Sequence, residues 1–281
     1  LNMLSGRSYN DLRQYPIFPF IISKLCDCFV LKDEQSYRDF STPIFALSKE
    51  KVQSVIISKY KEFPEDQIPY LFGELPSSAL VVTWYLVRVE PYTTIHVTQF
   101  QNAGKYPRFD LPDRIFKSIN SIIDYSKEFI PEFYYTPSFL VNENGFDLGV
   151  GSDHVKIQDV ILPGWARNSY CFVSTLRLML ESEVSDKLIS KWIDITFGPK
   201  RRTFLFDGKE YNLYKPYCFP ETPNSNFDQE VLQFGSMPEQ LFTESHPTRS
   251  QTTRINAFEI QISCSEFDYK AHFIKNLLKL I

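Results

Sequence analysis

A cysteine and a histidine are the residues of this sequence best suited to nucleophilic chemistry. Cys171 and His154 could form the nucleophile and base of a Cys-His hydrolase, in which the imidazole generates the attacking thiolate. Cys171, however, directly precedes Phe172 near the start of an amphipathic segment, where a buried and inert thiol is the commoner outcome. Both interpretations, a hydrolase pair and a structural thiol, stay open at this point.

Other catalytic or cofactor motifs are missing from the sequence. It contains no G-x-S-x-G, no P-loop, no H-E-x-x-H and no paired C-x-x-C. Cys26 and Cys28 form only a C-x-C, a fragment of a zinc site, and the four histidines lack metal-ligand spacing. We therefore expect no cofactor and no metal, and the pattern favours a binding module over an enzyme.

The composition is that of a globular protein with an aromatic core. The 281 residues include 25 Phe and 16 Tyr against only 10 Gly, and the formal net charge is -4. A negative chain argues against nucleic acid as the main partner, because phosphate binding needs clustered Lys and Arg. The one tight basic run, Lys200, Arg201 and Arg202, could contact an anionic membrane surface or form a solvated loop.

Polar residues near the start of the chain lie among aromatic ones. Arg7, Asn10 and Asp11 are interleaved with Tyr9 and Tyr15. One interpretation is an internal network, with Arg7 paired to Asp11 or another carboxylate, which holds irregular backbone in place. The other is an exposed groove that docks a neighbouring domain or a partner. The same two interpretations apply to Arg88, Glu90, Asp113 and Arg114.

Apolar periodicity predicts the elements that must position these residues. Helical spacing predicts four helices and a weaker pair, over Ser77–Glu90, Asp113–Phe129, Ser169–Glu181, Ser185–Phe197, Asp228–Phe234 and Pro238–Phe242. Residues 129–165 have neither a helical nor an alternating period, yet they are too aromatic for solvated loops. For this stretch the sequence predicts irregular backbone that is buried.

Nothing in the sequence divides it into separate domains. The Pro-rich stretch 216–226 is interpreted as a loop inside one domain, so residues 1–281 are expected to form a single domain. A last amphipathic segment carries Phe267, Ile274 and Leu278 on one face. It could bind a membrane surface or a partner, or it could dock on its own domain.

The opening of the chain closely resembles the signature of BEACH domains. The signature block is LNMLSGRSYNDLRQYPIFPF at residues 1–20. Further blocks follow in the family's order: YLVRVEPYTT (85–94), PDRIF (112–116), IPEFY (130–134), FDLG (146–149), DVILPGWA (159–166), LESE (180–183), WIDITFG (192–198) and QLF (240–242). Because so many blocks are collinear over residues 1–247, the sequence is identified as a member of the neurobeachin and lysosomal trafficking regulator family.

This resemblance implies both a fold and a role. The implied fold is mostly α, with extended non-regular segments in the centre, helices around them and little β structure. The implied role is a non-enzymatic scaffold in vesicle trafficking and membrane dynamics, lysosome-related, endosomal or autophagic, in the cytoplasm and peripheral to endomembranes. The implied partners are an adjacent pleckstrin-homology-like domain, a WD-repeat propeller and trafficking proteins.

The resemblance also sets the expected limits of the domain. The family pattern begins before Leu1, so the first helix is expected to be truncated, and residues 248–281 match as a weak C-terminal extension. Glu74-Leu75-Pro76 replaces a His/Tyr-rich stretch of the family, and Ala103-Gly104 replaces a Gly-Gly. These departures affect the expected docking surface more than the expected fold.

Overall fold

The fold is mostly helical with little strand, as the sequence predicts. A computed structural model describes residues 1–23, 31–73, 75, 78–99, 109, 127–150, 154–222, 231 and 234–249. The chain divides into two units, Leu1–Arg249 and Ser250–Ile281, and every described residue belongs to the first. That residues 1–281 form a single domain stays a prediction.

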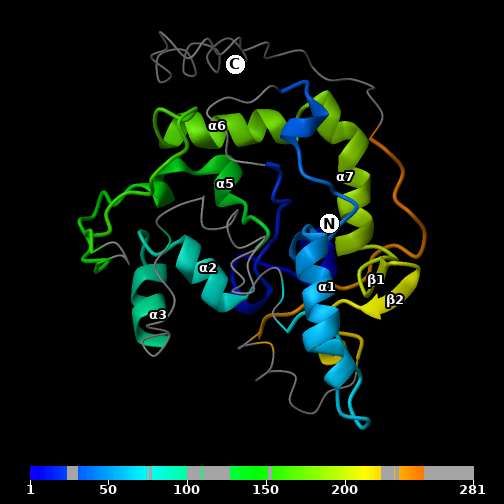
Figure 1. Ribbon diagram of the computed structural model, residues 1–281. Helices are drawn as coiled ribbons and strands as arrows, with labels where there is room; N and C mark the ends of the chain where they lie inside the picture. The colour runs from blue at the N-terminus through cyan, green and yellow to red at the C-terminus, as the bar shows by residue number, and fades with distance from the viewer. Residues whose placement is uncertain are drawn as a thin grey trace. The chain divides into compact units, whose positions relative to one another are not determined.

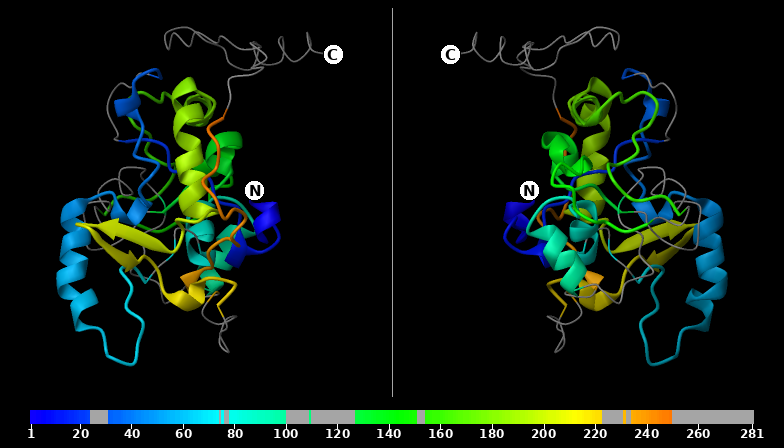
Figure 2. Two further views of the ribbon diagram at one scale, coloured as in Figure 1. Left: turned by 90° about the vertical axis from the view of Figure 1, so that its right-hand side faces the viewer. Right: turned by 90° about the vertical axis from the view of Figure 1, so that its left-hand side faces the viewer.

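The described α-helices lie around a centre of irregular chain (Figure 1). They are α1 (Lys49–Ser58), α2 (Ala79–Tyr85), α3 (Tyr92–Gln99), α5 (Glu132–Tyr135), α6 (Ser169–Leu180) and α7 (Glu183–Thr196). Short 3-10 turns cover Met3–Ser5, Leu12–Gln14, Glu34–Ser36, Ile44–Ala46, Tyr60–Glu62, Pro137–Leu140 and Pro216–Cys218. α1 lies at the periphery, and the loop that follows it projects outward in both views of Figure 2.

Helices α6 and α7 meet at a corner (Figure 1), and each begins at its own capping residue. Asn168 Oδ1 accepts the Cys171 N–H at 2.8 Å, and Ser182 Oγ accepts the Ser185 N–H at 3.1 Å. Such caps satisfy amides that have no partner inside the helix. The predicted helices Ser169–Glu181 and Ser185–Phe197 are confirmed, except that α7 begins two residues earlier, directly after its cap.

A two-stranded hairpin follows α7. β1 (Thr203–Phe206) pairs antiparallel with β2 (Lys209–Asn212), and Phe206 lies opposite Lys209. The two turn residues, Asp207 and Gly208, have φ of 47° and 74°. A two-residue turn with positive φ at both positions matches the right-handed twist of the strands, which is why Asp-Gly is favoured there.

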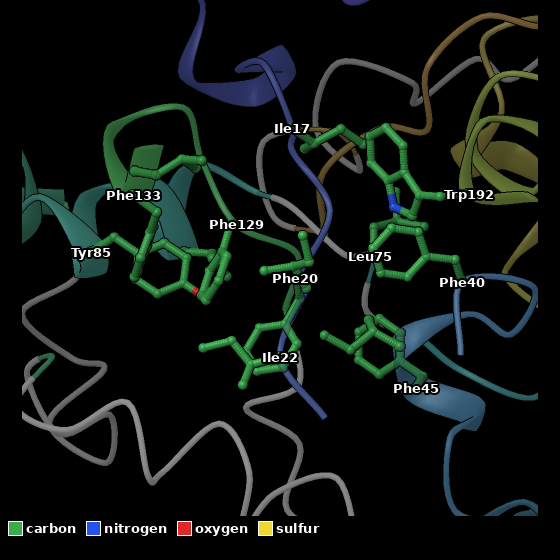
Figure 3. Close-up of a cluster of buried hydrophobic side chains, with 14 of the residues drawn as sticks. Ile17, Phe20, Ile22, Phe40, Phe45, Leu75, Tyr85, Phe129, Phe133 and Trp192 are labelled. Carbon is green, nitrogen blue, oxygen red and sulfur yellow. The ribbon is translucent and has the colours of Figure 1, made fainter. Parts of the chain in front are cut away.

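The centre of the unit is extended chain without regular structure, which confirms the predicted irregular core. Residues 17–22 pass between two groups of rings, Tyr85, Phe129 and Phe133 on one side and Phe40, Phe45 and Trp192 on the other (Figure 3). The Phe129 and Phe133 rings stack with centroids 4.0 Å apart. Isolated bridges, Phe18 with Phe129 and Ile22 with Tyr37, replace a continuous sheet.

Several helix predictions are wrong at their ends. The predicted helix Ser77–Glu90 is only α2, because Ser78 is its cap and regular helix ends at Tyr85. Phe129 is extended, since its carbonyl accepts the Phe18 N–H at 2.8 Å. The weaker helix predicted over Pro238–Phe242 is wrong as a whole, because these residues have no regular structure and the Leu241 N–H bonds the Phe197 carbonyl at 2.8 Å. The helix predicted from Asp113, most of that over Asp228–Phe234 and the C-terminal amphipathic segment lie outside the described residues.

Candidate functional site

Arg7 is a deeply buried charged residue of the signature segment. Its side chain is 1% exposed; Nε donates to the Tyr15 carbonyl at 2.7 Å and Nη1 to the Ser236 carbonyl at 2.7 Å. Burial lowers the pKa of Arg7 to about 9, and the charge of Asp11 opposes that shift, so the guanidinium is cationic at neutral pH. Arg7 thus joins two segments that are far apart in the sequence.

The expected pairing of Arg7 with Asp11 is wrong. The Asp11 carboxylate accepts the Arg13 N–H at 2.9 Å and its Nε and Nη2 at 3.0 Å. Asp11 precedes the 3-10 turn Leu12–Gln14 and caps it, so its oxygens face that turn and not Arg7. Asn10 and Tyr9 are exposed, and the Asn10 N–H bonds Ser8 Oγ at 3.2 Å.

Arg88 repeats the arrangement found at Arg7. It is buried, with Nε donating to the Gln158 carbonyl at 2.8 Å and Nη1 to the Phe109 carbonyl at 2.5 Å. Glu90 is exposed and accepts the Thr94 N–H at 3.2 Å at the start of α3. The structure therefore places Arg88 inside the core and Glu90 on the surface. Asp113 and Arg114 lie outside the described residues.

Sequence reasoning missed a third buried arginine and its carboxylate partner. Arg38 Nη2 donates to Glu128 Oε1 at 2.6 Å, Arg38 Nη1 donates to the Thr42 carbonyl at 2.9 Å, and Arg38 Nε donates to the Phe20 carbonyl. Glu128 also accepts the Phe20 N–H at 2.5 Å and Trp192 Nε1 at 3.2 Å. Burial raises the pKa of Glu128, and the Arg38 charge opposes that shift. No local motif marks this pair, because its members are 90 positions apart.

The predicted lipid-contact run contains one exposed residue, Lys200, one buried residue, Arg201, and one partly buried residue, Arg202. Arg201 is buried; Nη1 donates to the Pro238 carbonyl at 2.6 Å and Nη2 pairs with Glu221 at 2.6 Å. Arg202 pairs with the same carboxylate at 3.1 Å. Only Lys200 and Arg202 thus present their charges at the surface, and a contact with anionic lipid stays a prediction for these two.

Four buried arginines consequently share one role. Among the described residues, Arg7, Arg38, Arg88 and Arg201 each donate to backbone carbonyls of distant segments. Irregular chain leaves many carbonyls without a helix or sheet partner, and an unpaired buried carbonyl is costly. A guanidinium carries five donors in a fixed fork, which suits this use better than an ammonium. Carbonyls are thus the main acceptors of these four guanidinium groups, and the predicted role of Arg7 and Arg88 in an internal network or in partner docking stays a prediction.

A second cluster of polar and aromatic residues lies next to the signature segment. The Tyr15 hydroxyl donates to Glu132 Oε1 at 2.5 Å, and the Tyr9 ring meets the Tyr15 ring edge to face at 5.4 Å. The rings of Phe18 and Tyr135 also meet edge to face, at 6.1 Å. Tyr9, Tyr15, Phe18, Glu132 and Tyr135 are called the Glu132 cluster below. The sequence analysis named Tyr9 and Tyr15 but did not link them to Glu132, 117 positions from Tyr15.

The Cys171 and His154 side chains have separate surroundings. Cys171 is half-buried, and its Sγ lies 3.9 Å from the Trp165 carbonyl. His154 is exposed, with φ of 62°. In the described part of the chain no hydrogen bond joins the two side chains, whereas a nucleophile and its base need that contact.

The described residues show neither a metal-ligand cluster nor a membrane-spanning helix. No group of three or more His, Cys, Asp or Glu among them could hold a metal ion. No helix among them has the length and apolar content needed to cross a bilayer. Cys26 and Cys28 lie outside the described residues.

Comparison with known proteins gives concordant matches. The family model described as Beige/BEACH domain matches residues 1–249. Over 268 residues the chain is 35% identical to BEACH domain-containing protein B of Arabidopsis thaliana, covering 89% of this chain and 10% of that protein. It is 35% identical to the putative neurobeachin homolog of Caenorhabditis elegans (89% and 10%) and to BEACH domain-containing protein lvsE of Dictyostelium discoideum (91% and 12%). The chain thus spans about a tenth of the length of these relatives.

Proposed function

Because the chain belongs to the Beige/BEACH domain family, we propose that it is a non-enzymatic interaction domain of a much larger protein that acts in vesicle trafficking and membrane dynamics. Its partners are an adjacent pleckstrin-homology-like domain, a WD-repeat propeller of the same chain and trafficking proteins. It works in the cytoplasm, peripheral to endomembranes, without a cofactor. Residues 1–281 act as a single domain.

The observation that carries this proposal is an exposed apolar turn at the start of the signature segment. In the 3-10 turn Met3–Ser5, the Met3 side chain is 66% exposed and that of Leu4 is 74% exposed. Leu1 beside them is also exposed. Adjacent exposed apolar side chains are typical of surfaces that another domain covers. They lie close in sequence to Arg7, whose internal bonds fix this segment in one position.

The polar groups near that turn also support the proposal, because their hydrogen bonds are made within the domain. The guanidinium of Arg7 binds two carbonyls, and Asp11 caps a turn and pairs with Arg13. These groups hold the backbone, which is the requirement of a rigid docking surface. The length of the relatives supports the view that neighbouring domains are present in the parent protein.

The proposal predicts that acidic substitutions in the exposed turn weaken docking of the adjacent domain. The variant M3D/L4D is expected to weaken association with the preceding domain of the parent protein at least tenfold, because it places two charges in an apolar contact. Titration calorimetry of the two separately produced domains measures this effect. The matched control is Leu205→Asp, which alters an exposed leucine on β1 and should leave the affinity unchanged. Absence of any association between the wild-type domains would contradict the proposal.

A further inference from the structure

The carboxylate of Glu132 is only partly satisfied by the protein. Oε1 accepts the Tyr15 hydroxyl at 2.5 Å, while Oε2 is buried and has no hydrogen-bond partner among the described residues. Burial raises the pKa of Glu132, and the bond from Tyr15 opposes that shift. An acceptor oxygen left in this state is destabilising unless another group supplies a donor.

Aromatic rings surround this carboxylate at the surface. The Tyr9 side chain is 53% exposed and that of Tyr135 is 56% exposed. Partial burial raises the pKa of Tyr9, and the charges of Glu132 and Tyr135 add to that rise, so these groups are close to one another. Aromatic faces carry a negative quadrupole, and together with a carboxylate they form an environment that favours a cation.

The chain already shows one cation bound to a ring of this cluster. The guanidinium carbon of Arg177 lies 5.4 Å from the centre of the Tyr135 ring. The guanidinium of Arg13, on the 3-10 turn after Tyr9, is bound to Asp11 at 3.0 Å. Glu132 Oε2 has no donor among the described residues, which leaves it for a donor from elsewhere.

We propose that the Glu132 cluster binds an arginine side chain of a protein partner, which donates to Glu132 Oε2 and stacks on the Tyr9 ring. The inference rests on the proposed function, because it names the partner chemistry of one surface of the interaction domain. A guanidinium is favoured over a quaternary ammonium, since Oε2 requires an N–H donor and a quaternary ammonium has none. Oε2 is covered in the unbound structure, and in this proposal the exposed side chain of Tyr9 turns aside as the arginine enters.

Tyr9 is placed to make that movement. It belongs to the turn between Gly6 and the 3-10 turn Leu12–Gln14, outside any helix or strand. Its ring contacts Tyr15 edge to face, and more than half of its side chain is in solvent. An exposed aromatic side chain in a turn changes rotamer at little cost, whereas Tyr15 is buried and bound to Glu132.

A matched pair of peptides tests the proposal on the whole 281-residue chain. The probes are acetyl-Gly-Arg-Gly-amide and the same peptide with citrulline, which keeps the shape of arginine and lacks its charge. The readout is the fluorine resonances of Tyr9 and Tyr135 in protein labelled with 3-fluorotyrosine. The arginine peptide is expected to bind at least tenfold more tightly than the citrulline peptide. Equal affinity, or no shift of either resonance, would overturn the proposal.

Two variants assign the binding to this cluster. Glu132→Gln is expected to weaken the arginine peptide at least tenfold, while the control Glu143→Gln, an exposed carboxylate, leaves it unchanged. Tyr9→Ala, which removes an exposed ring, is expected to weaken binding of the arginine peptide at least threefold with an unchanged melting temperature. If Glu132→Gln does not fold, Tyr9→Ala decides alone: full affinity in that variant would refute the site.

The test separates this inference from the function on which it rests. If the adjacent domain associates in calorimetry but the arginine peptide does not bind, the interaction domain stands and the Glu132 site is refuted. If neither binds, both are refuted. Tetramethylammonium chloride serves as a third probe, and a shift of the Tyr9 resonance equal to that caused by the arginine peptide would contradict the requirement for an N–H donor.

Discussion

Replacing Glu128 with glutamine is expected to lower the free energy of unfolding by about 3 kcal/mol, because it leaves a buried guanidinium without its counter-charge. Both members of the pair are buried, with side-chain exposures of 2% for Arg38 and 5% for Glu128. Glu128 also accepts from the Phe20 amide and from Trp192 on α7. The Glu128 carboxylate therefore connects the central extended segment at Phe20, the segment of Arg38 and helix α7.

Urea denaturation of the wild type and the variant measures this effect. The matched control is Glu181→Gln, whose carboxylate pairs with Arg249 at 3.2 Å on the surface and which should change stability by less than about 0.5 kcal/mol. The double variant R38M/E128L should cost less than the sum of its single variants, since no buried charge remains unpaired. A Glu128→Gln protein as stable as the wild type would show that the pair does not hold the core.

Replacing Arg7 with methionine is expected to cost about 2–4 kcal/mol, although methionine fills much of the same volume. The variant leaves the carbonyls of Tyr15 and Ser236 buried without their donors. The free energy of unfolding of Arg7→Lys should lie between those of the wild type and Arg7→Met. A lysine keeps the charge, but its ammonium cannot reproduce the fork that reaches both carbonyls.

Thermal and urea unfolding of these variants provide the measurement. Arg13→Met is the control, since Arg13 is close in sequence, partly exposed and paired with Asp11 at the surface. It should change the free energy of unfolding by no more than about 1 kcal/mol. Equal losses for Arg7→Met and Arg13→Met would mean that burial of Arg7 contributes nothing specific to the fold.

The elements that the sequence predicts well are those with a cap and a clear apolar face. The segment after Asn168 satisfies both conditions, and the predicted helix differs from α6 by one residue. The helix α1 was missed because its apolar positions are few and its inward face includes the buried Lys51. The hairpin was also missed, although the Asp207-Gly208 turn between two aromatic stretches is a strong hairpin signal.

The wrong predictions share a physical reason. The segments around Phe129 and Leu241 have helical spacing, but their backbone groups bond to Phe18 and Phe197. Tertiary hydrogen bonds of this kind override local propensity, and they cannot be read from periodicity. They also account for the irregular core, in which single bridges take the place of ladders.

The sequence indicated that Arg7 needs hydrogen-bond partners, but it did not indicate which groups those partners are. The location of Arg7 among aromatic residues predicted a pairing with Asp11 or another carboxylate, whereas the guanidinium is buried and binds no carboxylate among the described residues. Its acceptors are carbonyls, one of them on Ser236, 229 positions away. Glu128 and Glu132 were not singled out, because a carboxylate beside Phe129 or Pro131 resembles any other polar residue until its distant partner is known.

The account depends on buried guanidinium groups that hold irregular chain segments together through backbone carbonyls. Hydrogen exchange measured by mass spectrometry on the Arg7→Met protein tests this most directly, because Arg7 Nη1 donates to the Ser236 carbonyl at 2.7 Å and so bonds residues 235–242 to the signature segment. The account predicts that exchange in residues 235–242 accelerates more than exchange in α6. Unchanged protection of residues 235–242, or an equal acceleration throughout the described part of the chain, would contradict it.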